Sequence, residues 1–173
     1  MKTGLETISL TPEAILERAW DEEIKNRMCL VIETEAPVLE DLLFKRVLNS
    51  LSLRKLGSRL LPVFESIAAL LPYERTQDRM GYVYHNGKEE DFFRPSPDSS
   101  DRYSYQIPTQ EAAVCLEYIL SQEEKTVTKT RLLQLFRREM GYERAGSQVE
   151  SLFEAASKSG RIGRTGNGRF KSI

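Results

Sequence analysis

Apolar residues recur at helical spacing in the first part of the chain. Between residues 12 and 35 they stand four apart, at Leu16, Trp20, Ile24, Met28 and Ile32. This stripe predicts one amphipathic helix, which Thr11 caps and which Pro37 ends near Glu35. A second helix is expected over 38–51, with these apolar side chains inward: Leu39, Leu42, Leu43, Val47 and Leu51.

A third helix is expected over 58–71, where Ser58 is the natural cap. The period then changes from that of a helix to that of a strand. Residues 73–94 alternate aromatic or apolar with polar residues around Asn86-Gly87, which predicts a β-hairpin with its turn there.

The second half of the chain repeats this order of elements. We expect a capped helix, a short strand, two further helices and a Gly-rich hairpin, over 109–122, 126–128, 131–140, 147–159 and 160–173. Between the halves, residues 95–102 are rich in Pro and Ser, which predicts a linker.

A short phrase occurs once in each half, as LRKLGSR from Leu53 and as YERAGSQ from Tyr142. A shift of 89 residues superimposes the two phrases and aligns Val38 with Val127, Gly57 with Gly146, Ser58 with Ser147, Phe64 with Phe153 and Glu65 with Glu154. We interpret this as an internal repeat of one supersecondary unit. In each copy, the Gly is expected to supply a left-handed turn and the Ser to cap the next helix.

Three helices with a tight turn between the second and third, followed by a β-hairpin, form the winged-helix arrangement. The predicted fold class is therefore mainly α with small β-hairpins (α+β), built from tandem winged-helix or helix-turn-helix units. The expected domains are a long N-terminal helix with the first unit over 1–95, a linker over 96–106 and the second unit over 107–173.

Charge is distributed unevenly along the chain. The net charge is −1, but residues 1–128 hold 15 Lys or Arg against 22 Asp or Glu, whereas residues 129–173 hold 10 against 4. The second unit therefore carries the basic surface. With 40% apolar and 29% charged residues and no apolar run of about 18 residues, the composition is that of a folded domain without a membrane span.

Basic and polar side chains mark a candidate nucleic-acid surface. In a helix-turn-helix, the third helix and the wing approach the major groove and the phosphates. The candidates in the first unit are Arg54, Lys55 and Arg59. Those in the second unit are Arg144, Ser147 and Gln148 at the third helix, and Lys158, Arg161, Arg164, Arg169 and Lys171 on the wing. Glutamates on the third helices oppose phosphate binding: Glu65, Glu150 and Glu154.

Most of the chain, about residues 28–165, resembles a domain of unknown function that lies at the C-terminus of large bacterial superfamily-one DNA/RNA helicase-like proteins. Residues 32–60 match its opening at Glu35, Pro37, Arg46, Gly57 and Arg59. A later segment matches its spaced arginines, Arg94 and Arg102, and its Ile-Pro-x-x-Glu motif over 107–111. The family often has glycine at the position of Ser52. The resemblance implies a role beside a DNA-processing machine and brings no established activity.

Two functions fit these observations. The favoured one is a non-catalytic accessory domain that binds duplex or branched DNA mainly by phosphate contacts, in helicase-type DNA processing. The alternative is a winged-helix module for protein–protein interaction or homodimerisation, docking on a helicase or nuclease partner. No enzyme, metal or cofactor is expected, because His85 is the only histidine and Cys29 and Cys115 lack metal-ligand spacing. Two isolated cysteines fit a reducing, cytoplasmic location.

Overall fold

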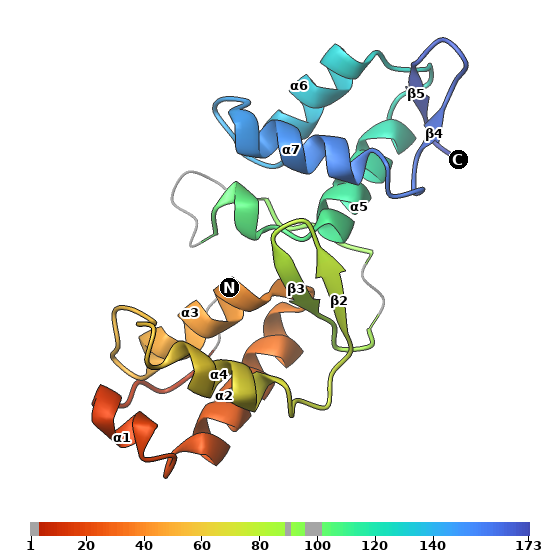
Figure 1. The fold of residues 1–173 in the computed structure, drawn as a ribbon. Helices are drawn as coiled ribbons and strands as arrows, with labels where there is room; N and C mark the ends of the chain where they lie inside the picture. The colour runs from red at the N-terminus through yellow and green to blue at the C-terminus, as the bar shows by residue number, and fades with distance from the viewer. Residues whose placement is uncertain (1–3, 89–90, 96–101) are drawn as a thin grey trace. The chain divides into compact units, whose positions relative to one another are not determined.

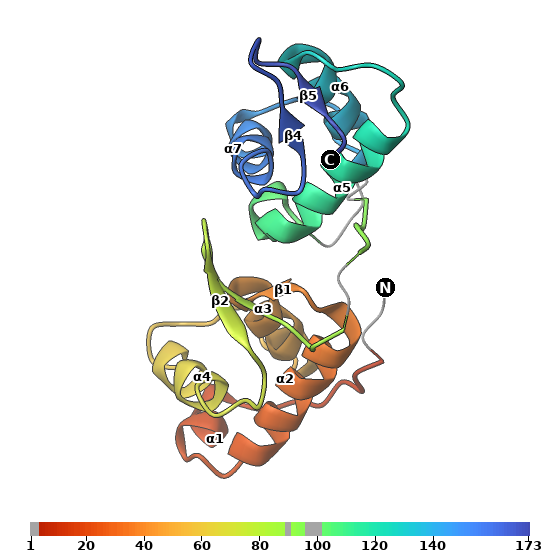
Figure 2. The same cartoon turned by 90° about the vertical axis from the view of Figure 1, so that its right-hand side faces the viewer.

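The structure, a computed structural model, describes residues 4–88, 91–95 and 102–173. Over these residues the chain is mixed α/β. It contains helices, a small antiparallel sheet and a separate two-stranded hairpin, which confirms the prediction of helices with small β-hairpins. The chain divides into two compact units, shown in Figures 1 and 2. Unit 1 comprises Met1–Gln77 and Gly81–Lys88, and unit 2 comprises Asp78–Met80 and Glu89–Ile173. Residues 96–101 of the expected linker lie outside the described residues.

Unit 1 consists of helices that pack against one another and of a short antiparallel sheet. Its elements are α1 (Pro12–Leu16), α2 (Asp21–Glu35), β1 (Val38–Leu39), α3 (Glu40–Ser50), α4 (Leu61–Ala68), β2 (Arg75–Asp78) and β3 (Gly81–Tyr84). The strands stand in the order β1–β3–β2, and Val38 of β1 pairs antiparallel with Tyr84 of β3.

The first helix is interrupted, where the apolar stripe had predicted one continuous helix. The Thr11 cap is confirmed, since its Oγ1 accepts a hydrogen bond from the Ala14 amide at 3.2 Å. However, α1 ends at Leu16, and Arg18 then adopts a left-handed φ of 63°. The next helix begins at Asp21, because three acidic residues in its first turn, Asp21, Glu22 and Glu23, favour a helix N-terminus there.

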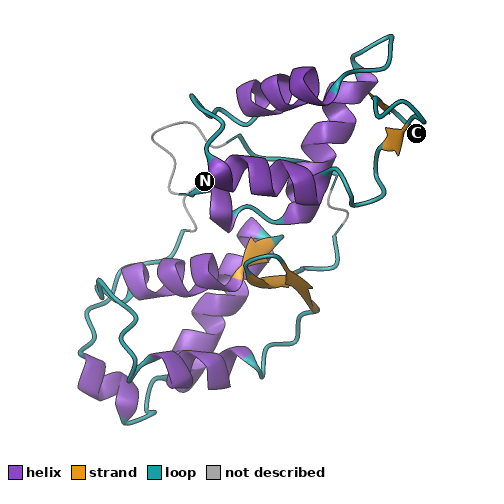
Figure 3. Cartoon of the chain, turned by 45° about the horizontal axis from the view of Figure 1, so that its top comes forward, coloured by secondary structure: helices purple, strands orange, loops and turns teal. Residues whose placement is uncertain are grey.

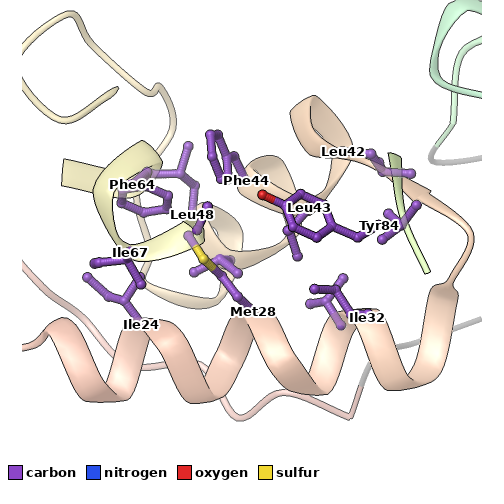
Figure 4. Close-up of a cluster of buried hydrophobic side chains, with 14 of the residues drawn as sticks. Ile24, Met28, Ile32, Leu42, Leu43, Phe44, Leu48, Phe64, Ile67 and Tyr84 are labelled. Carbon is purple, nitrogen blue, oxygen red and sulfur yellow. The ribbon is translucent and has the colours of Figure 1, made fainter. Parts of the chain in front are cut away.

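The core of unit 1 forms where α2 lies against α3 and α4 (Figure 4). Ile24, Met28 and Ile32 of α2 are fully buried, as the apolar stripe predicted, but Trp20 of the same stripe is 38% exposed. The Phe44 and Phe64 rings meet edge to face, with centroids 5.5 Å apart. The residues expected to point inward from the second helix are buried too: Leu39, Leu42, Leu43, Val47 and Leu51.

Two local expectations for unit 1 were wrong. Helix α4 starts at Leu61 with no side-chain cap, so Ser58 does not cap it. The hairpin turns at Arg79 and Met80, between β2 and β3, and Asn86-Gly87 follows the last strand. An Asn-Gly pair also suits turns outside hairpins, and here Asn86 Oδ1 accepts from the Lys88 amide at 3.1 Å.

Unit 2 has the same kinds of elements (Figure 3). They are η1 (Ser104–Gln106), α5 (Thr109–Ser121), α6 (Lys129–Glu139), α7 (Ser147–Ala156), β4 (Gly163–Arg164) and β5 (Phe170–Lys171). The expected strand at 126–128 is reduced to one residue, Val127, which bridges antiparallel to Phe170 of β5. Because unit 2 includes Asp78, that carboxylate caps its first long helix: Oδ2 accepts from the Thr109 amide at 2.7 Å.

The internal repeat extends beyond the residues that the sequence aligned. Helices α3 and α6 begin 89 residues apart and also end 89 residues apart. Core positions obey the same spacing, and each member of these pairs is at most 1% exposed: Leu43 and Leu132, Val47 and Phe136, Leu51 and Met140, Phe64 and Phe153. In each unit, the extended residue before the second of the three long helices pairs with the last strand. The two units therefore repeat one order of elements and one strand pairing.

The left-handed turn of the repeat lies earlier than the Gly-Ser pairs. Neither Gly57 nor Gly146 has a positive φ, and the N-cap of α7 is Gly146 itself, so Ser147 does not cap it. The left-handed residues are Ser52, with φ of 58°, and Gly141, with φ of 80°. These two are also 89 residues apart and directly follow the C-caps of α3 and α6. Glycine is favoured at such a position because it has no Cβ.

Gly141→Ala should therefore destabilise the protein by about 1–2 kcal/mol, because alanine strains a left-handed backbone. Chemical denaturation measures this change. Gly166→Ala is the matched control: Gly166 lacks a positive φ and has no atom within 4 Å of an added Cβ, so its substitution should leave stability nearly unchanged. Equal losses in the two variants would contradict this explanation of the turn.

Candidate functional site

The turn before α7 carries the first group of expected contacts. Arg144 is exposed in this turn, and Ser147 and Gln148 are exposed in the first turn of α7. No side chain caps α7, so its first amide groups and the positive end of its dipole are available at the surface. Glu150 is also exposed in this turn and adds one negative charge.

Two of the five expected wing residues anchor the hairpin. Arg161 Nη1 lies 2.8 Å from Glu117 Oε2 and 3.4 Å from Asp91 Oδ1. The hydrogen bond to Glu117 raises the pKa of Arg161 above its ordinary value, although burial acts in the opposite direction. Arg169 donates from Nε to Thr126 Oγ1 and from Nη2 to the Thr126 carbonyl, both at 2.8 Å. Both arginines therefore fasten the β4–β5 hairpin to the body of unit 2.

The other three wing residues are exposed: Lys158, Arg164 and Lys171. The Arg164 guanidinium lies 5.0 Å from the centroid of the Phe170 ring, which orients it while leaving its N–H groups available. Together with Arg144, these three side chains have no ion-pair partner in the part of the chain that the structure describes. Unit 2 thus presents four unpaired cations: Arg144 before α7, Lys158 just after it, and Arg164 and Lys171 on the hairpin.

The candidates of the first unit lie in the connection between α3 and α4. Arg54, Lys55 and Arg59 are all exposed there. They belong to unit 1, so they are not part of the group of cations in unit 2. The structure therefore divides the expected contacts into two separate sets.

Sequence reasoning missed a groove along α6. Its volume is about 490 Å³, and it is lined by Thr130, Arg131, Leu133, Gln134, Leu135, Arg137, Arg138 and Ala145. Arg137 is held in it, because Nη1 donates to the Glu143 carbonyl at 2.7 Å. The signal was present in the sequence: Arg131, Gln134 and Arg138 stand at spacings of three and seven residues, which place them on one helix face.

Three residues of the pattern that resembles the helicase-associated domain, Arg94, Arg102 and Glu111, form a buried ion cluster at α5. Both oxygens of Glu111 accept hydrogen bonds from Arg94 and Arg102, including Arg94 Nη2 at 2.8 Å and Arg102 Nη1 at 2.9 Å. The Glu111 side chain is fully buried and that of Arg102 is 7% exposed. Burial raises the pKa of Glu111, but the hydrogen bonds from Arg102 and Arg94 outweigh it and lower that pKa below its ordinary value. This cluster is enclosed, which suits a stabilising contact.

A second ion pair joins matched residues in unit 1. Arg46 Nε on α3 donates to the two carboxylate oxygens of Glu35, at 3.1 and 3.3 Å, and Glu35 is 3% exposed. Pro37, between them in sequence, is buried as well. The spacing of these residues is thus explained by packing at the junction of α2, β1 and α3.

Other reactive groups remain scattered. Over the described ranges, no three His, Cys, Asp or Glu side chains gather as metal ligands would. His85 is half-buried, and its Nε2 lies 2.8 Å from Thr76 Oγ1. Cys115 is buried, which raises the pKa of its thiol, and Cys29 is half-buried; both are free thiols. In the part of the chain described, none of the helices has the length and apolar character that crossing a membrane requires.

Comparison with known families gives one partial match. Residues 13–61 are similar to a family described as "Protein of unknown function (DUF3320)". This stretch runs from α1 to the start of α4 and includes the segment 32–60. The description names no activity, ligand or partner. Neither the curated proteins nor the solved structures include a match to the chain.

Proposed function

We propose that this protein is a non-catalytic accessory module that binds duplex or branched nucleic acid through unit 2. The observation that carries the proposal is a set of four exposed, unpaired cations in unit 2: Arg144 in the turn before α7, Lys158 just after α7, and Arg164 and Lys171 on the β4–β5 hairpin. Arginine and lysine side chains in such positions bind phosphate oxygens by charge-assisted hydrogen bonds.

The proposal includes a winged-helix assignment for each unit. Both units contain three main helices, a short extended segment after the first of them, and a terminal pair of strands whose last member pairs with that segment. In a winged helix this order puts the third helix and the hairpin turn beside the nucleic acid. Under this assignment, the four cations lie beside α7 or on the hairpin of unit 2.

Phosphate contacts should dominate over base readout. Lysine and arginine on a Gly-rich hairpin follow a backbone of any sequence, whereas Gln148 is the only exposed amide in the first turn of α7. Exposed Glu150 on the same helix disfavours deep insertion into the major groove. We propose that this binding assists a helicase-type DNA-processing machine, as the resemblance implies.

Salt dependence tests the proposal. If all four cations contact phosphates, the logarithm of the association constant for a duplex of about 20 bp should fall with the logarithm of salt with a slope near −3.6. Arg144→Ala/Arg164→Ala should reduce the magnitude of this slope by about 2. Fluorescence anisotropy at several salt concentrations measures both values.

Arg54→Ala/Lys55→Ala is the matched control, because it removes the same charge from exposed positions of unit 1. Its slope should stay close to that of the unaltered protein. If the salt slope of this variant fell as much as that of the unit 2 variant, binding would depend on overall charge and the assigned surface would be wrong. No binding at low salt would reject the nucleic-acid function itself.

A further inference from the structure

We infer that the groove along α6 binds an acidic, leucine-bearing peptide segment of a partner protein. This goes beyond the proposed nucleic-acid function and is independent of it, since none of the residues lining the groove belongs to the four cations assigned to phosphates. The occupant is identified by the chemistry of the groove, which pairs cationic side chains with apolar ones.

Two arginines of the groove, Arg131 and Arg138, have a spacing that matches two turns of a bound helical peptide. Arg131 and Arg138 are exposed and seven residues apart on α6, which separates them by about 10 Å along the helix axis. Carboxylates seven residues apart on an α-helical peptide have the same spacing. None of the acidic residues that the structure describes lines the groove; the nearest in sequence, Glu139, is paired with Arg138 at 3.1 Å.

Arg137 provides an orienting donor inside the groove. Its Nη1 is held by the Glu143 carbonyl at 2.7 Å. Its Nε is shielded from solvent and has no hydrogen-bond acceptor among the residues described. A shielded N–H without a partner lowers stability, so a ligand carboxylate that accepts from it gains affinity by satisfying it.

The apolar lining favours a peptide over a nucleic acid. Leu135 is buried, and Leu133 and Ala145 are half-buried, so they add hydrocarbon surface to the lining of the groove. A sugar-phosphate backbone presents mainly charged phosphate oxygens and covers such a surface poorly, whereas a leucine side chain covers it with hydrocarbon. A hollow of about 490 Å³ also has the size of a site for side chains rather than for a convex duplex. An amphipathic helix lying in a groove is an established mode of peptide recognition.

The test uses the full chain and a fluorescein-labelled synthetic peptide of about 12 residues, with leucine at every third or fourth position and glutamate elsewhere. Saturable binding is expected. Arg131→Ala/Arg138→Ala should weaken it about fivefold to tenfold, as the loss of two exposed charge pairs implies. A peptide with glutamine in place of every glutamate should bind more weakly by a similar factor.

Arg144→Ala/Arg164→Ala is the matched control, with the same loss of charge outside the groove, and should leave peptide binding unchanged. Absence of saturable binding, equal binding of the glutamine peptide, or equal weakening by the two double variants would each overturn the inference. A duplex of about 20 bp is tested in parallel. If Arg131→Ala/Arg138→Ala weakens duplex binding and the peptide does not bind, the groove belongs to the nucleic-acid surface. If the peptide does not bind but the duplex does, the proposed nucleic-acid function is unaffected.

Discussion

Replacing Glu111 with alanine should lower the free energy of unfolding by about 3–5 kcal/mol. The Glu111 carboxylate accepts hydrogen bonds from both Arg94 and Arg102 and has no exposed surface. Its removal leaves the Arg102 guanidinium, 7% exposed, without its carboxylate partner. Urea denaturation followed by circular dichroism measures the loss. Glu124→Ala removes an exposed carboxylate from the same unit and should change stability by less than about 0.5 kcal/mol.

The same cluster makes stability depend on pH. The folded pKa of Glu111 lies below its ordinary value of 4.5, so in acid the unfolded chain takes up this proton before the folded chain does. The contribution of the cluster is therefore complete above about pH 4.5 and is lost as pH falls through the folded pKa. Glu111→Gln should flatten this part of the acid stability profile. An unchanged profile would show that the cluster does not couple protonation to folding.

Phe64→Ala and Phe153→Ala should each cost about 3–5 kcal/mol, because each ring is almost fully buried and its loss opens a cavity. Phe64 packs on Phe44 in unit 1, and Phe153 packs on Phe136 in unit 2 at 5.8 Å between centroids. The two positions are 89 residues apart, so equal costs would support the internal repeat.

Hydrogen exchange can locate each loss. Phe64→Ala should reduce amide protection in α2, α3 and α4, and Phe153→Ala should reduce it in α5, α6 and α7. Leu70→Ala, at a position that is 71% exposed, serves as the control and should leave protection unchanged. A loss of protection over the whole chain in either variant would argue against two separate cores.

Most of the helices could be predicted because buried apolar side chains determine them. Ile24, Met28 and Ile32 form one face of α2 and fill the core, and that periodicity is visible in the sequence. The break at Arg18 could not be predicted in this way, because a left-handed residue and a new N-terminus at Asp21 leave the apolar spacing almost intact.

The turns were harder to predict because several local sequences satisfy the same geometry. The sequence predicted left-handed turns at Gly57 and Gly146, but the left-handed residues are Ser52 and Gly141. Ser52 adopts this conformation without being glycine, and its hydroxyl donates to the Ile8 carbonyl at 3.0 Å. Tertiary contacts of this kind are not encoded in local propensity.

The site shows a similar division. Sequence identified the basic residues of unit 2, but it did not separate Arg161 and Arg169, which anchor the hairpin, from Arg164, which is exposed. That separation depends on acceptors far along the chain, such as Glu117 and Thr126. The groove along α6 depends on a loop residue, Ala145, that no helical pattern includes.

The most direct test of the nucleic-acid surface is an NMR titration of the isotopically labelled chain with a duplex of about 20 bp. We expect chemical-shift changes to concentrate at Arg144, Gln148 and Arg164, on the α7 turn and the β4–β5 hairpin of unit 2. Amides at Arg54 and Lys55 in unit 1 should shift little. Changes centred on unit 1, or no changes at low salt, would contradict the account.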